Sequence, residues 1–421
     1  MTSIPGPESI FRREFPNGMT VLVRENFSSP SVVIEGLLRA GAVDEPADKA
    51  GLASFAAACL MRGTERRTFQ QIYEEVESIG ASVDVGGGLN TSGFGAKSLA
   101  EDLPVVIDVL ADVLQHPVFP FAEVEKERGE IVTALEERAH DTRRMASLTF
   151  RKLLYPAGHP YGRSTTGYLE TIPSITRDDL ETFYRTHFGA KGMIVVIVGA
   201  VKAEAAFEAW ERAFGSWQGA DNHGEPIPPV PQLENVRREF APVPGKTQSD
   251  IILGFVGPAR ADPDFWDANL CNTILGVFGL MGRLGTNVRD KLGLAYYAYS
   301  RVEGGVGSGP WSLVAGVNPA NVERAVEAMR VEIRRIRDKA VGSKELEDNK
   351  AFVTGTLPLR LETNDGVAGT LLDMEFYGLG LDYLERYKNM VYAITPKRIQ
   401  AAAQKYLDSD HYALAVAGPN T

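Results

Sequence analysis

Arg289 and Tyr296 are two residues whose types and spacing could do chemistry. They stand seven positions apart in Gly282–Ser300, which reads GRLGTNVRDKLGLAYYAYS. A guanidinium and a phenol are fixed hydrogen-bond donors, and they can stabilise the oxyanion that forms as water attacks a peptide carbonyl. A simpler structural interpretation is also open, in which Arg289 forms a surface ion pair and Tyr296 is a half-buried strand residue.

The motifs of several other chemistries are absent from the sequence. It contains no G-x-x-x-x-G-K-[ST] phosphate loop, no G-x-S-x-G elbow, no CxxC, and neither H-E-x-x-H nor H-x-x-E-H. The chain has six histidines. No two of them are three or four positions apart, the spacing at which one helix face can ligate a metal twice. A histidine-rich metal site is therefore not expected.

Composition narrows the class of protein. A length of 421 residues allows two to four domains at about 100–200 residues each. The formal charge of −11 argues against nucleic acid as the main partner, because neutralising phosphates requires clustered Lys and Arg. No window reaches the roughly 18–20 apolar residues of a membrane span, and the N-terminus lacks an apolar run of signal-peptide length. We expect a soluble cytoplasmic protein.

A proline-rich stretch divides the chain into halves of similar size. Residues 215–239 contain four prolines from Pro226 to Pro231. Proline fixes φ and removes a backbone donor, so this stretch suits an extended connector.

The two halves resemble each other. ITRDDLETFYRTHFGAKGMIVVIVG (175–199) matches ITPKRIQAAAQKYLDSDHYALAVAG (394–418) at a constant offset and without a gap. In both copies an amphipathic helix precedes an apolar strand. The repeat indicates an internal duplication, and we predict homologous domains at 1–214 and 240–421 joined by the linker 215–239.

Strands and helices do not alternate strictly within a half. In the first half we expect strands at 31–38, 81–85 and 91–96, with helices near 49–61 and 69–79 between them. Clusters of strands separated by clusters of helices predict an α+β fold rather than a doubly wound parallel sheet.

One predicted helix has a face of small residues. Residues 50–64 read AGLASFAAACLMRGT, which places Ser54, Ala57 and Ala58 on one side at i, i+3 and i+4. Close helix packing is the simplest interpretation. The pattern G-L-A-x-F-x-x-x-x-L-x-[KR]-G-T also resembles the inverted-zincin helix of the pitrilysin peptidases, family M16, which include insulinase and the mitochondrial processing peptidase.

In active members of that family this helix carries H-x-x-E-H, two zinc ligands and a general-base glutamate. The resemblance places these three functions at Ser54, Ala57 and Ala58, which cannot perform them. The family's third ligand is a glutamate after an ERG-type run, and its region aligns with 133–134 here. The nearby glutamates would face another side of the helix, so we count this ligand as lost too; they are Glu130, Glu136 and Glu137. Zinc is therefore expected in a partner and not in this chain.

The resemblance covers essentially the whole chain. It extends over 11–23, 103–131, 159–188 and 193–199, and it includes the duplication. It implies two homologous LuxS/MPP-like domains of α+β class, each a mostly antiparallel sheet packed with helices.

The second half retains a family motif with functional residues, whereas the first half has lost its zinc ligands. Gly282–Ser300 resembles the family segment R-L-x-x-x-[IV]-R-x-x-x-G-L-x-Y, which implies that Arg289 and Tyr296 hold the substrate carbonyl across a chamber from the zinc. Asn90 resembles the asparagine that precedes a substrate-pairing edge strand, a strand that binds peptide by β-augmentation. Gly93 and Gly95 would weaken such a strand.

These resemblances imply a non-catalytic, substrate-binding subunit. The partner would be an M16 chain with an intact H-x-x-E-H, forming a heterodimer, and the substrate would be a peptide. A purely structural subunit, like the core proteins of respiratory complexes, is the alternative. A homodimer and a hydrolase with a relocated metal site also stay open, although the scattered histidines offer no constellation for the latter.

Overall fold

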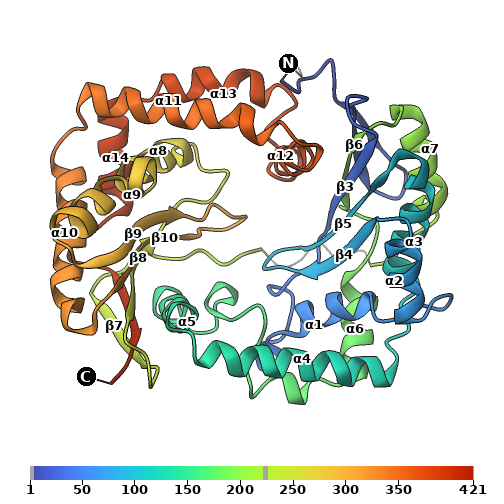
Figure 1. Cartoon of the computed structure of the whole chain (residues 1–421), viewed down its shortest axis with the longest axis horizontal. Helices are drawn as coiled ribbons and strands as arrows, with labels where there is room; N and C mark the ends of the chain where they lie inside the picture. The colour runs from blue at the N-terminus through green and yellow to red at the C-terminus, as the bar shows by residue number, and fades with distance from the viewer. Residues whose placement is uncertain (1–3, 221–225, 421) are drawn as a thin grey trace. The chain divides into compact units, whose positions relative to one another are not determined.

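A computed structural model describes residues 4–220 and 226–420 of the chain. The described residues fall into two compact units (Figure 1), each built from three separate stretches of sequence. Unit 1 comprises residues 1–134, 164–226 and 357–386, and unit 2 comprises residues 135–163, 227–356 and 387–421.

Unit 1 is built on a six-stranded sheet with the order β1-β2-β6-β3-β5-β4. Only β2 and β6 pair in parallel, and the other neighbours are antiparallel. The strands are β1 (Phe11–Glu14), β2 (Thr20–Glu25), β3 (Ser31–Leu38), β4 (Ser82–Gly87), β5 (Ser92–Leu99) and β6 (Ile194–Gly199).

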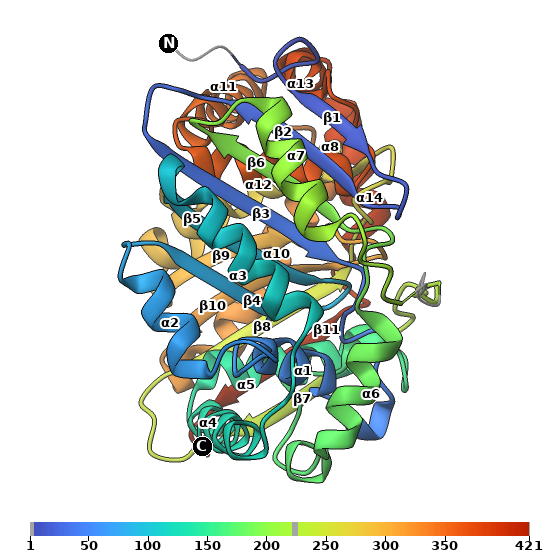
Figure 2. The same ribbon diagram turned by 90° about the vertical axis from the view of Figure 1, so that its right-hand side faces the viewer.

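Helices cover both faces of this sheet. Figure 1 shows α3 (Leu103–Gln115) and α7 (Ala203–Phe214) on one face and α12 (Asn364–Phe376) on the other. Figure 2 shows α3 and α7 in front of the strands. Because β6 is covered on both sides, all six of its residues are buried, and its sequence is the continuous apolar run IVVIVG.

Unit 2 is built on a five-stranded sheet with the order β7-β11-β8-β10-β9, in which only β7 and β11 are parallel. The strands are β7 (Arg237–Pro242), β8 (Ser249–Val256), β9 (Ala295–Val302), β10 (Pro310–Val317) and β11 (Ala413–Gly418). The remaining helices of the two units are α1 (Leu52–Leu60), α2 (Phe69–Glu77), α4 (Phe121–Ala139), α5 (Thr142–Leu154), α6 (Arg177–His187), α8 (Phe265–Gly276), α9 (Phe278–Leu284), α10 (Val322–Asp338), α11 (Ser343–Arg360), α13 (Tyr383–Tyr392) and α14 (Pro396–Tyr406).

The two sheets repeat one topology. The order β2-β6-β3-β5-β4 in unit 1 matches β7-β11-β8-β10-β9 in unit 2, with the same parallel pair in each. Thr176 and Thr395 cap the equivalent helices α6 and α14 through their hydroxyls. The predicted fold class, two homologous α+β domains with mostly antiparallel sheets, is confirmed.

The compact units do not follow the linear halves of the sequence. Helix α5 lies in the first half but packs on β7, β8 and β11 of unit 2. Helix α12 lies in the second half but packs on β3 and β6 of unit 1. Each sheet is thus covered by a helix from the other half. The boundaries 1–214 and 240–421 stay a prediction for the duplicated halves.

The predicted linker 215–239 contains both irregular chain and the start of a strand. Residues 226–236 contain no helix or strand, whereas β7 begins at Arg237 inside the predicted linker. Residues 221–225, including His223, lie outside the described part of the chain. Within the described part, no helix is long and apolar enough to cross a membrane.

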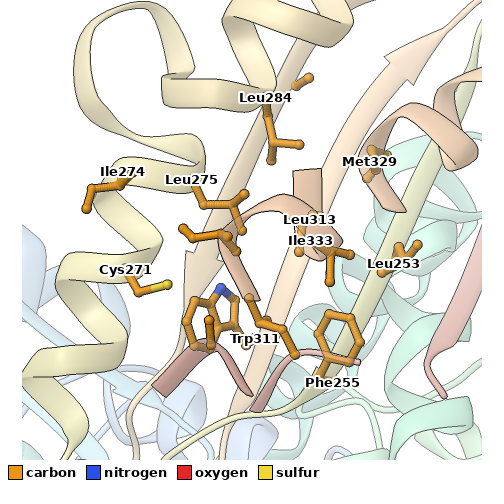
Figure 3. Close-up of a cluster of buried hydrophobic side chains, with 14 of the residues drawn as sticks. Leu253, Phe255, Cys271, Ile274, Leu275, Leu284, Trp311, Leu313, Met329 and Ile333 are labelled. Carbon is orange, nitrogen blue, oxygen red and sulfur yellow. The ribbon is translucent and has the colours of Figure 1, made fainter. Parts of the chain in front are cut away.

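The core of unit 2 lies between its sheet and the helices α8 and α10. Figure 3 shows Trp311 and Phe255 from the strands among aliphatic side chains of the helices. Trp311 is fully buried and Phe255 is 2% exposed. Burying side chains of this size contributes roughly 1.5–3 kcal/mol each. The same cluster contains Leu284, which ends α9 and anchors the helix that follows.

Candidate functional site

Arg289 lies on a π-helical turn, residues 285–291, directly after α9. Leu284 and Val288 are fully buried in the core of unit 2 and hold this turn in place. The Arg289 side chain is 36% exposed, and its ion pair with Asp290 is long, at 3.9 Å between Nη1 and Oδ1. π-helical turns are rare and often occur at functional sites. The core therefore positions the guanidinium, and the side chain stays partly accessible to solvent.

A tight turn connects this helix to β9. The Gly293 N–H donates to the Arg289 carbonyl over 3.0 Å, and the N–H of buried Leu294 donates to the Val288 carbonyl over 3.0 Å. Gly293 has φ +60°, a conformation that glycine adopts without steric cost. Gly293 and Leu294 thus fix the backbone conformation of the segment that joins Arg289 to Tyr296.

Tyr296 is the extra residue of a β-bulge at the start of the edge strand β9. Ala295 pairs with Val317 and Tyr297 pairs with Gly316, so Tyr296 has no partner in the ladder. A bulge re-aims a side chain and is common beside active sites. The Tyr296 side chain is 71% exposed, more than the half-buried residue of the structural interpretation. Its hydroxyl has no hydrogen-bond partner among the described residues.

A buried acid beside this strand escaped the sequence analysis. Asp250 on β8 is 1% exposed and accepts hydrogen bonds from the hydroxyls of Tyr297 and Thr142. Burial raises the pKa of the Asp250 carboxyl. Because Thr142 begins α5, this contact attaches α5 to the sheet of unit 2. A charged residue within the apolar strand SDIILGFV was the available signal.

The small face of α1 is a close packing contact with the edge strand β4. Ser54 Oγ donates to the Thr165 carbonyl over 2.7 Å and lies 3.5 Å from the Gly87 carbonyl. A Cβ added to Gly87 would lie 2.5 Å from the Ser54 Cα. Ala57 is fully buried and Ala58 is half-buried. These side chains do not fit a zinc ion, because the one hydroxyl is bonded to backbone and the others are methyl groups.

The glutamates near the expected third ligand position do not compensate. Glu130 and Glu127 both bind Arg62 at the end of α1, with Glu127 Oε2 2.7 Å from Arg62 Nε. Glu136 and Glu137 are exposed. Across residues 4–220 and 226–420, no group of three or more His, Cys, Asp or Glu side chains could hold a metal ion.

Asn90 lies in the turn between β4 and β5 of unit 1. The expectation that an edge strand follows Asn90 is wrong, because β5 pairs with β3 on one side and β4 on the other. The edge strand of this hairpin is β4, which precedes Asn90. Full pairing of β5 also explains how it tolerates Gly93 and Gly95, since the neighbouring strands hold it. A substrate contact at Asn90 stays a prediction.

Two family models match the chain. The model described as insulinase (peptidase family M16) matches residues 20–160, and the model described as the peptidase M16 inactive domain matches residues 174–352.

Proteins similar in sequence to this chain come from bacteria and yeast. An uncharacterized zinc protease of Streptomyces coelicolor is 25% identical over 98% of this chain and 90% of its own length. The mitochondrial-processing peptidase subunit beta of Saccharomyces cerevisiae is 25% identical over 87% of this chain and 81% of its own length.

Solved structures share the fold. A peptidase M16 inactive domain from Pseudomonas fluorescens superposes with a TM-score of 0.90, at 24% identity and 98% coverage of both chains. A protease from Helicobacter pylori superposes with a TM-score of 0.89, at 19% identity, covering 99% of this chain and 100% of that one.

Proposed function

This chain belongs to peptidase family M16, and we propose that it is the substrate-binding subunit of a two-chain peptidase whose zinc is held by the partner. The observation that carries the proposal is a contrast between two sites. Tyr296 presents an exposed donor and Arg289 a partly exposed one on the same helix–turn–strand element. The zinc-helix positions hold Ser54, whose hydroxyl bonds to backbone, and the methyl groups of Ala57 and Ala58, so none of them offers a zinc ligand.

In this role Arg289 and Tyr296 donate hydrogen bonds to a carbonyl oxygen of the bound peptide. Negative charge develops on that oxygen when the peptide bond is attacked, and fixed donors stabilise it without reorganising. The guanidinium contributes a charge that does not titrate in the working pH range, and the phenol adds a neutral donor. The partner is expected to be a family member with an intact H-x-x-E-H.

The names of the relatives support a peptidase role, and the name of the yeast relative supports an assembly of more than one subunit. Several are called zinc proteases, and the yeast relative is called a subunit of the mitochondrial-processing peptidase. A structural subunit without a part in proteolysis is the alternative, and it would share the loss of zinc ligands. The retained donors at Arg289 and Tyr296 favour the substrate-binding role.

The purified chain alone provides the first test. We expect no stoichiometric zinc by mass spectrometry of the metal and no peptide cleavage, whether the chain is monomeric or a homodimer. One bound zinc per chain together with peptidase activity would overturn the proposal. Cleavage that appears only after adding a partner chain with H-x-x-E-H would support it.

A further inference from the structure

A pocket opens in unit 2, on the same helical segment as Arg289 but without Arg289 in its lining. Its volume is about 770 Å³. Its walls come from α8, α9, the turn 285–291, the end of α10 and the first two turns of α11. None of its lining residues has a part in the function proposed above.

The pocket is positively charged within an acidic protein. Its cationic lining residues are Arg283, Lys291, Arg335 and Lys344. Its acidic lining residues are already paired, Glu345 with Arg283 through two contacts of 2.7 and 2.8 Å and Asp348 with Lys344 at 2.9 Å. Lys291 Nζ instead donates to a neutral amide oxygen, Asn287 Oδ1, over 3.1 Å. The N-terminal end of α11 adds a partial positive charge. Arg335 lies 3.7 Å from the buried Glu332, so among the described lining cations only Lys291 lacks an acidic ion-pair partner, and its charge favours an anionic group.

Two buried polar atoms of the lining lack partners. Neither Arg283 Nη1, a donor, nor Asn349 Oδ1, an acceptor, has a hydrogen-bond partner among the described residues. Asn349 is 2% exposed, and its amide nitrogen donates to the Glu345 carbonyl over 2.8 Å. Buried polar groups are nearly always paired, so an unpaired donor and acceptor in one pocket point to a ligand that offers both.

The rest of the lining is apolar. Ile274 is buried in the core, while Phe278 and Leu280 belong to α9, and Leu280 is 67% exposed. An exposed leucine beside a charged pocket can contact an apolar side chain of a ligand. The pocket therefore combines cationic donors, one amide acceptor and an apolar wall.

We propose that this pocket binds the C-terminal residue of a peptide. The terminal carboxylate meets Arg283 and Lys291, the last amide N–H donates to Asn349 Oδ1, and an apolar side chain packs on Phe278 and Leu280. Capture of a terminal carboxylate is an established mode of peptide recognition. The site goes beyond the proposed function, because it binds peptide independently of Arg289, Tyr296 and the partner.

Isothermal titration of the full chain alone tests this site. The probes are a pentapeptide ending in leucine with a free carboxylate, the same peptide amidated, and free leucine. We expect saturable binding of the first at one per chain and at least tenfold weaker binding of the other two. Equal affinity for the amidated peptide, or no saturable binding, overturns the proposal. Free leucine binding as tightly as the peptide overturns the assignment to peptides.

Matched charge reversals identify the pocket as the site. Lys291→Glu places a negative charge in the lining, and we expect at least a tenfold loss of affinity for the free-carboxylate peptide. Lys246→Glu makes the same change at an exposed residue outside the lining, and affinity should be unchanged. Unaltered affinity in Lys291→Glu contradicts the proposal. Because no partner is present, failure here leaves the role of Arg289 and Tyr296 untouched.

Discussion

The Ser54 hydroxyl donates a 2.7 Å hydrogen bond to the carbonyl oxygen of Thr165, and the Ser54 Cα lies against Gly87 of the edge strand β4. This contact occupies the Ser54 position on the helix face that, in active members of the family, carries the zinc ligands. The difference from an active site is therefore one of packing as well as of side-chain type. A larger side chain at Ser54 meets the backbone of Thr165 and Gly87.

Restoring the motif in this chain should fail to restore the metal site. The triple variant Ser54→His, Ala57→Glu, Ala58→His overpacks α1 against β4, and overpacking of this kind costs about 1–3 kcal/mol. We expect a lower urea midpoint and less than stoichiometric zinc by metal analysis. Ala58→His alone is the control, since Ala58 is only half-buried. One zinc per chain with unchanged stability would contradict this account.

Acid stability should depend on Asp112 of α3. Burial alone would raise its pKa, but hydrogen bonds from Thr64, Arg67 and Arg66 outweigh burial and hold the pKa below its usual 3.8. The ionised Asp112 carboxylate therefore stabilises the folded state fully above about pH 4, and this stabilisation is lost as the pH falls through the lowered folded-state pKa.

Asp112→Asn removes that contribution. The Asp112 side chain is fully buried, whereas its partner Arg66 is half exposed. Breaking a wholly buried pair costs roughly 3–5 kcal/mol, so we expect this variant to lower the free energy of unfolding by a smaller amount, about 2–3 kcal/mol. Urea unfolding at pH 7 and pH 3 measures it, and the difference from wild type should shrink at pH 3. The control Asp108→Asn, at a 48% exposed side chain, should cost less than about 1 kcal/mol. Equal costs would show that burial is not the cause.

The exchanged helices predict that a fragment of the chain does not fold alone. A fragment of residues 1–220 lacks α12, whose fully buried Leu371 covers β3 and β6. We expect no cooperative thermal unfolding by circular dichroism. Appending residues 357–386 through a flexible linker should restore cooperativity. A cooperative transition in the fragment without α12 would show that the exchange is unimportant for unit 1.

The repeated segments made much of the fold predictable. The match of 175–199 with 394–418 correctly placed α6 before β6 and α14 before β11, because capping threonines and apolar runs are local signals. The exchange of α5 and α12 was beyond local pattern. An amphipathic helix shows that one face is buried, but not which sheet buries it.

The site was predicted less completely, for a related reason. The sequence singled out Arg289 and Tyr296 but not the bulge that exposes Tyr296, since a bulge depends on register with β10. Asn90 was placed before an edge strand by its resemblance to the asparagine of the family, and local sequence does not show which strand of a hairpin is the edge. Which of the two is the edge is decided by pairing with β3, a long-range contact.

The most direct measurement of the central claim is peptide turnover by a reconstituted pair. The chain is mixed with a partner carrying H-x-x-E-H, and assembly is verified by gel filtration. Removing one oxyanion donor lowers kcat by about 10²–10³-fold in well-studied hydrolases. We predict losses of this order for Arg289→Ala and Tyr296→Phe with assembly intact, and no loss for the control Arg301→Ala at an exposed position of β9. Unchanged turnover in both variants would contradict the account and favour a structural subunit.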